Sequence, residues 1–159
     1  MRRLLLILLA VVAFLPVAEA QHLKVGEKLP TIDVDSSVGS DLKSVDREYT
    51  CIVFMHSESQ PSLNAIREFT KQTKGVRSDL ALVLITTEQD GFEQELLNSF
   101  TSSDTIVAFD NNCRTFENFN VQHIPFAVVY QTKSRRVMWF GSLSQLGVEQ
   151  LYRVIERLM

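Results

Sequence analysis

Cysteine, tryptophan and proline are scarce in this 159-residue chain, which has two, one and four of them. The cysteines, Cys51 and Cys113, are too few and too far apart for a disulfide framework or a zinc site. A large excess of one charge is also missing, because 16 Lys and Arg stand against 19 Asp and Glu. This mild acidic balance argues against nucleic acid or an anionic membrane as a partner.

The first twenty residues have the order of a secretory signal peptide. Two arginines precede an uncharged apolar run over residues 4–18, and a small-x-small sequence ends at Ala20. The run is shorter than the about 20 residues that a membrane-spanning helix needs, and no lipid-carrying cysteine follows it. We therefore expect a signal peptide over 1–20, a periplasmic or secreted protein, one domain over 21–159 and no stable membrane anchor.

Apolar patterning predicts an α/β domain with a mixed sheet and helices on both of its faces. The run at 51–55 is apolar throughout, as in a strand buried on both faces, whereas Leu63, Ile66 and Phe69 recur at helical spacing. The predicted strands are 31–35, 51–55, 80–85, 105–109, 125–130 and 136–140. The predicted helices are 61–73, 89–100, 112–119 and 144–158, and a turn is predicted at 36–40.

Three short patterns follow one another along the chain. Residues 25–30 read Val-Gly-Glu-Lys-Leu-Pro, residues 54–62 read Phe-Met-His-Ser-Glu-Ser-Gln-Pro-Ser, and residues 121–125 read Val-Gln-His-Ile-Pro. They resemble the V-G-x-x-x-P lead-in, the F-W-A-x-W-C-x-P-C motif and the cis-proline loop of the thioredoxin superfamily, in particular of exported TlpA- and ResA-type thiol:disulfide oxidoreductases. The resemblance spans nearly all of residues 25–158. It implies a thioredoxin-like three-layer α/β/α fold with a central mixed sheet and a cis-Pro loop at Pro125.

The chain departs from that family where the two redox cysteines stand. The matching residues are Ser59-Gln60-Pro61-Ser62, a degenerate form of the C-x-x-C motif. In the family the first cysteine sits at the positive end of a helix, which favours the thiolate. A serine hydroxyl is far too weak an acid to ionise there without a base, and it forms no mixed disulfide. Dithiol exchange at this position is therefore chemically excluded for the sequence as it stands.

Ser59 has two further interpretations. With His56 or His123 it would be a nucleophile, but a hydrolase also needs an orienting acid and an oxyanion hole, and no G-x-S-x-G signature is present. The favoured interpretation is that Ser59 caps the following helix through its hydroxyl. The two histidines with Glu58 would be a minimal set of metal ligands, and solvent-facing histidines are commoner. We expect no metal and no cofactor.

The two cysteines each have a structural and a chemical interpretation. Cys51 begins a buried strand, and core packing is its expected role because the peroxiredoxin pattern P-x-x-x-[ST]-x-x-C is missing. Cys113 lies in a polar segment beside Arg114, where a thiolate is favoured. A reactive thiol at Cys113 and a Cys51–Cys113 disulfide remain open as alternatives.

Two hypotheses for function follow from the resemblance. In the first, the protein is a redox-inactive module that binds an exported polypeptide or protein, since the backbone before the cis-proline pairs with extended peptides in this fold. The binding residues would be His123, Ile124 and Pro125 together with His56 and Glu58.

In the second hypothesis, the protein is a thiol:disulfide oxidoreductase. Cys113 or Cys51 would then carry the exchange, or Ser59 and Ser62 would be substitutions of native cysteines.

Overall fold

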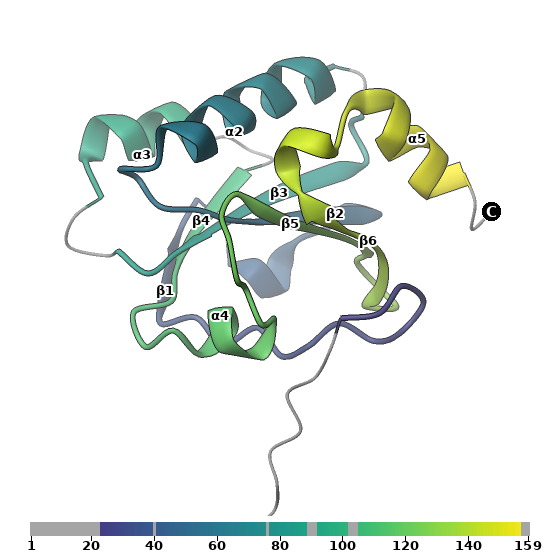
Figure 1. Cartoon of the computed structure of the whole chain (residues 1–159), viewed down its shortest axis with the longest axis horizontal. Coiled ribbons are helices and arrows are strands. Elements are labelled where there is room, and N and C mark those ends of the chain that lie inside the picture. The colour runs from purple at the N-terminus through teal and green to yellow at the C-terminus, as the bar shows by residue number, and fades with distance from the viewer. Residues whose placement is uncertain (1–22, 40, 76, 89–91, 102–104, 157–159) are drawn as a thin grey trace, which may run out of the picture.

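The computed structural model describes residues 23–39, 41–75, 77–88, 92–101 and 105–156 (Figure 1). Its strands form one six-stranded sheet in the order β1-β4-β3-β2-β5-β6. The strands are β1 (Ser36–Val38), β2 (Tyr49–Phe54), β3 (Leu80–Thr86), β4 (Thr105–Phe109), β5 (Phe126–Gln131) and β6 (Arg136–Ser142). The helices are α2 (Gln60–Thr73), α3 (Gln94–Phe100), α4 (Arg114–Asn118) and α5 (Val148–Glu156), with 3-10 turns η1 (Leu42–Ser44) and η2 (Leu143–Gln145).

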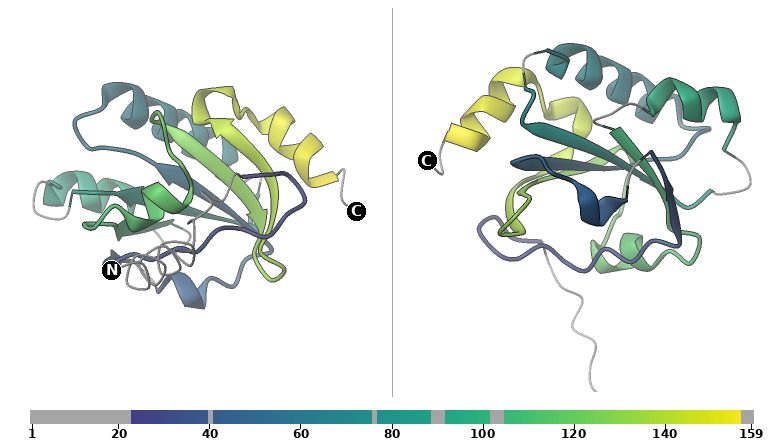
Figure 2. Two further views of the ribbon diagram at one scale, coloured as in Figure 1. Left: turned by 60° about the horizontal axis from the view of Figure 1, so that its bottom comes forward. Right: turned by 180° about the vertical axis from the view of Figure 1, so that it is seen from behind.

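The sheet is mixed, and helices cover both of its faces. The strand β2 pairs parallel with β3 and antiparallel with β5, and both β2 and β3 are buried along their whole length. Helices α2, α3 and α5 lie on one face, and α4 with the N-terminal lead-in lies on the other (Figures 1 and 2). The predicted α/β/α architecture is confirmed, and the continuous apolar run that predicted the central strand is explained by burial on both sides.

A stacked arginine joins α5 to the sheet. The Arg77 guanidinium lies 5.6 Å from the ring centre of Tyr49 in β2 and 5.1 Å from that of Tyr152 in α5. The same group pairs with Asp79, with Nε 2.9 Å from Oδ1, and only 10% of the arginine side chain is exposed. Cation–π contacts of this kind strengthen when they are shielded from water.

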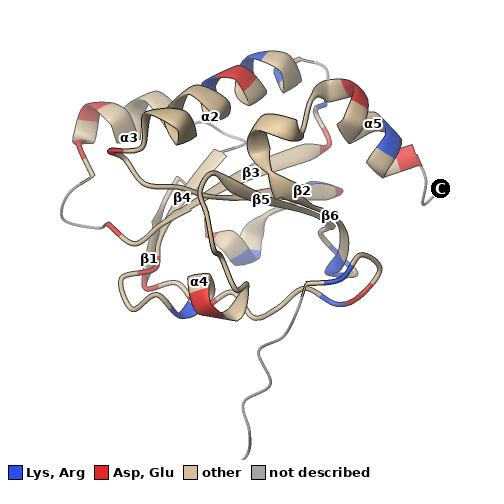
Figure 3. Cartoon of the chain, viewed as in Figure 1, with Lys and Arg blue, Asp and Glu red and all other residues tan. Residues whose placement is uncertain are grey.

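On the surface, acidic and basic residues are interspersed along α2 and α5 (Figure 3).

The first predicted strand is wrong in position. The structure places β1 at 36–38, where a turn was predicted, and residues 31–35 form no strand. The Asp33 N–H donates to the side chain of Thr115, and the Asn118 side chain donates to a carbonyl of the same segment, so side chains of α4 replace a strand partner. Strand pairing with β4 begins only where the Asp35 N–H donates to the Phe109 carbonyl.

Three helices are shorter than predicted. The α3 helix begins at Gln94 rather than 89, although residues 89–91 lie outside the described residues. The α4 helix occupies 114–118 of the predicted 112–119. The predicted helix 144–158 divides into η2 and α5, because Leu146 leaves the helical conformation and turns into the core; residues 157 and 158 are not described. The remaining strands and α2 agree with prediction to within two residues.

Candidate functional site

Strand register brings three loops to one end of the sheet. Phe54, the last residue of β2, is paired with Ile85 of β3 on one side and with Phe126 of β5 on the other. The segments that follow β2 and β3 and the segment that precedes β5 therefore meet there. They contain residues 55–59, 87–88 and 121–125, which include the predicted binding residues.

Ser59 caps the helix that begins beside it. Its side chain accepts a hydrogen bond from the Ser62 N–H at 3.3 Å, and its carbonyl accepts from the Leu63 N–H at 3.0 Å. Pro61 lies in the first turn, where a missing N–H leaves no helix bond unmade. The interpretation of Ser59 as a cap is confirmed, and this geometry explains why the helix starts here.

The second serine completes a closed pair with the first. Ser62 is fully buried, and its hydroxyl lies 2.9 Å from the Ser59 Oγ, to which it donates. In the described part of the chain, Ser59 Oγ has no hydrogen bond to an imidazole. A serine nucleophile paired with His56 or His123 therefore has no support from the geometry.

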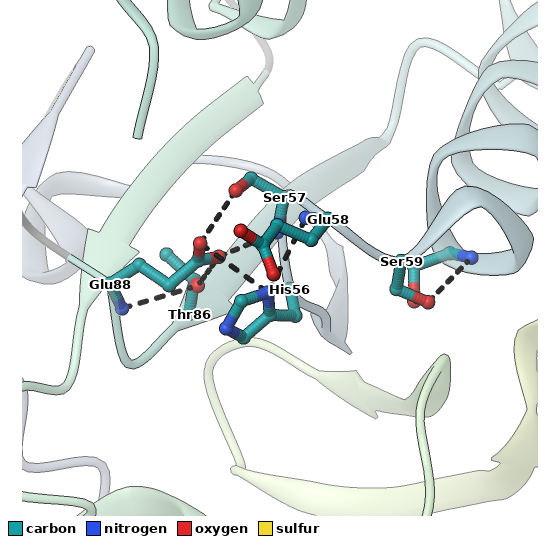
Figure 4. Close-up of polar contacts among 7 residues, drawn as sticks. His56, Ser57, Glu58, Ser59, Thr86 and Glu88 are labelled. Atoms are coloured by element: carbon teal, nitrogen blue, oxygen red, sulfur yellow. Dashed lines mark hydrogen bonds and ion pairs between the residues drawn. The ribbon is translucent and has the colours of Figure 1, made fainter. Parts of the chain in front are cut away.

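A largely buried carboxylate, Glu88, which sequence reasoning missed, anchors the loop between β2 and α2. Glu88 accepts from the Ser57 N–H and hydroxyl, each at 2.5 Å, and from the Thr86 hydroxyl at 2.9 Å (Figure 4). Its Oε1 lies 3.4 Å from the His56 Nδ1, and only 11% of the Glu88 side chain is exposed. The one available sequence signal was its place just after the carboxyl end of a buried strand, where sites in α/β sheets gather.

The loop before β5 presents its backbone and one histidine. The Ile124–Pro125 peptide bond is cis, and the Pro125 carbonyl accepts from the Leu143 N–H at 3.2 Å. His123 is exposed and packs edge-on against Phe126, with ring centres 5.6 Å apart. Within the described residues, the backbone N–H and C=O groups of His123 and Ile124 have no hydrogen bond. Unpaired groups of this kind are what an extended peptide requires.

Solved structures with the same arrangement of strands and helices carry thioredoxin and peroxiredoxin names. A thioredoxin-like protein in the oxidized form shares 11% identity at a TM-score of 0.64, with 86% of this chain and 97% of that chain covered. The mitochondrial 2-Cys peroxiredoxin of Plasmodium falciparum shares 13% sequence identity at a TM-score of 0.55, and the match covers 85% of this chain and 94% of that chain. A thioredoxin-like protein of Bacteroides caccae shares 12% sequence identity at a TM-score of 0.55, and the match covers 83% of this chain and 50% of that chain.

The chain has a thioredoxin-like fold. These likenesses establish the fold alone, because the identities are low. No protein-family model and no curated protein sequence matches the chain.

In this thioredoxin-like fold, the two thiols lie apart from each other. Cys51 is fully buried in β2 within the core covered by α2 and α5, and burial raises the pKa of its thiol to about 12. Cys113 is exposed on the segment before α4, in a left-handed conformation with φ of 57°. Both cysteines are free, so the alternative of a Cys51–Cys113 disulfide is wrong. A thiol that resists ionisation at Cys51 is a poor nucleophile at neutral pH.

The remaining expected site residues are found at the same sheet end. Glu58 and Gln60 are exposed, and the Glu58 N–H lies 3.3 Å from the His56 Nδ1. Among the described residues, no group of three His, Cys, Asp or Glu side chains is arranged to hold a metal ion. No helix within the described ranges has the length and apolar character needed to cross a bilayer.

Proposed function

We propose that this chain is an exported, redox-inactive thioredoxin-like protein that binds an extended polypeptide. The binding face comprises two sets of residues. His56, Glu58, Ser59 and Gln60 lie before and at the start of α2, and His123, Ile124 and Pro125 lie before β5. The observation that carries the proposal is the unpaired backbone of His123 and Ile124, beside a helix start whose serines are already engaged with each other. A TlpA- or ResA-type ancestry is part of the proposal.

Backbone pairing accounts for affinity without a thiol. An extended peptide added next to His123 and Ile124 would satisfy their N–H and C=O groups, and neighbouring side chains would select its sequence. The aromatic pair Phe126 and Phe140, with ring centres 6.4 Å apart, borders the same loop, and Phe140 is 37% exposed. These two aromatic rings favour a partner that has an apolar side chain next to the loop before β5.

Export is proposed from residues 1–20, which lie outside the described residues. Their order of two arginines, an apolar run and a small-x-small sequence supports cleavage after Ala20 and a periplasmic or secreted protein.

An oxidoreductase stays as the second candidate because of one distance. The Oγ atoms of Ser59 and Ser62 are 2.9 Å apart and face each other, so cysteines at both positions would need little movement to reach the about 2.05 Å of a disulfide. This geometry supports the version in which Ser59 and Ser62 are substitutions of native cysteines. The version in which Cys51 carries the exchange is weakened, because that thiol is fully buried.

Binding to a defined unfolded polypeptide tests the proposal. Reduced, carboxymethylated lactalbumin is the probe, and amide chemical shifts of the protein (residues 21–159) locate the contact. We expect changes at Gln60, His123 and Ile124. Gln60→Trp, which places a bulky side chain on the exposed start of α2, should weaken binding at least about tenfold, or about 1.4 kcal/mol.

The matched control is Lys133→Trp, an equally bulky change at an exposed position in the β5–β6 turn, at the other end of β5. It should bind the probe as the unmodified protein does. The proposal is wrong if the probe does not bind, or if Gln60→Trp and Lys133→Trp behave alike.

A further inference from the structure

One nitrogen of His56 has two neighbours that require opposite protonation states. The Glu58 N–H lies 3.3 Å from Nδ1, and the Glu88 Oε1 lies 3.4 Å from the same atom (Figure 4). To accept from an N–H, Nδ1 must keep its lone pair; to approach a carboxylate favourably, it must carry a proton. Both contacts are long for hydrogen bonds, which is consistent with a ring placed between two alternatives.

The two partners of the imidazole differ in how firmly they are held. Glu88 is fixed by three donors from Ser57 and Thr86 and only 11% of its side chain is exposed, whereas 40% of the His56 side chain is exposed. The carboxylate is therefore the stationary group, and the imidazole is open to solvent. Glu58 is the titratable group next to this ring on its own loop, and His123 lies on the loop before β5 at the same sheet end.

We infer that Glu88 positions His56 as a proton-dependent contact on the proposed polypeptide-binding face. The inference rests on the proposed function. In the neutral form, Nδ1 accepts from the Glu58 N–H, which closes the turn before α2. When a proton from solvent binds Nδ1, the N–H so formed donates to Glu88, and the Glu58 N–H is released.

Protonation therefore adds one donor and a positive charge to the binding face. The released Glu58 N–H becomes available to a carbonyl or carboxylate of the partner, and the Nε2–H, which the neutral ring already carries, becomes a charge-assisted donor. Histidine is the side chain whose charge ordinarily changes between about pH 5 and 8. The partner class is an extended polypeptide with a carboxylate or free carbonyl beside Glu58, and its binding strengthens as the pH falls through that range.

The test has one part that needs no ligand. In the free protein, the Glu58 amide resonance is followed beside the His56 ring resonances from pH 8 to pH 5. We expect the amide and ring signals to move together, and we expect the Glu58 amide to lose this movement in His56→Gln, which has no titrating ring. If the Glu58 amide resonance of the unmodified protein does not shift with the His56 ring resonances, the inference is overturned, whether or not any polypeptide binds.

The second part measures affinity for carboxymethylated lactalbumin at pH 5.5 and pH 8. The unmodified protein should bind roughly fivefold tighter at pH 5.5, as one partly exposed charged contact warrants. This ratio should fall to about one in both Glu88→Gln and His56→Gln. A purely structural role for Glu88 would weaken binding at both pH values and keep the ratio, which would overturn the positioning role. If the probe binds at neither pH, the proposed function fails, while the amide titration still decides the inference.

Discussion

The Ser59–Ser62 pair makes a quantitative prediction about stability that depends on the order in which hydroxyls are removed. Ser59→Ala removes the cap of α2, which costs about 1 kcal/mol. It also leaves the buried Ser62 hydroxyl without its acceptor, which costs a further 1–3 kcal/mol or so. We therefore expect Ser59→Ala to lower the free energy of unfolding by about 2–4 kcal/mol.

Removing both hydroxyls should do less damage than removing the first alone. Ser62→Ala leaves the cap intact and should cost no more than about 1 kcal/mol. In the double variant Ser59→Ala/Ser62→Ala the cap is lost but no buried hydroxyl is stranded, so its cost should return to about 1–1.5 kcal/mol. The double variant should thus be more stable than Ser59→Ala, which independent sites cannot produce.

Urea unfolding, fitted with a shared m-value, gives the free energy of unfolding of the unmodified protein, the two single variants and the double variant. Ser59→Asn is the control, because it keeps a side-chain oxygen that can cap the helix. Additive costs, with the double variant less stable than Ser59→Ala, would refute the account of the pair. So would a Ser59→Ala variant as stable as the unmodified protein.

Three further outcomes follow from the fold. In the native protein, the exposed thiol of Cys113 should react with a disulfide reagent. Cys51, whose buried thiol has a pKa raised to about 12, should react only after unfolding. Two thiols that react fast in the native protein would contradict the burial of Cys51. Arg77→Lys keeps the charge but loses the planar stack between two tyrosine rings, so it should lower the free energy of unfolding by about 1–2 kcal/mol, measured by urea denaturation. Burial raises the pKa of the Asp110 carboxyl, so the folded state holds that proton more firmly than the unfolded state and its charge lowers stability at neutral pH. Asp110→Asn, which keeps an acceptor for the Phe116 N–H, should be more stable than the unmodified protein at pH 7 and lose this advantage as the pH falls toward about 4; an advantage that persists at low pH would point to another cause.

Local signals predicted the central elements of the fold well. The apolar runs of β2, β3 and β4 are visible because both faces of these strands are buried, and α2 is visible from its apolar spacing and from Pro61 in its first turn. The same signal misplaced β1. Residues 31–35 alternate as a strand does, but their backbone groups bond to side chains of α4, which a pattern along the chain does not reveal.

The candidate site was predictable only in part, for a related reason. The serines, histidines and Pro125 were found because each lies in a short local motif. Glu88 was missed because its role depends on contacts with Ser57, 31 residues earlier in the sequence, and these exist only once β2 and β3 are paired. Tertiary pairing of this kind decides which carboxylates become buried anchors.

Reduction of insulin disulfides by the protein (residues 21–159), beside a Ser59→Cys/Ser62→Cys variant, tests the central claim most directly. The account predicts no activity above the dithiothreitol background for the unmodified protein and clear activity for the variant, because the cysteines would stand at the start of α2, at the sheet end where the Pro125 loop also lies. Activity in the unmodified protein would contradict the account, since Cys113 or Cys51 would then be the working thiol.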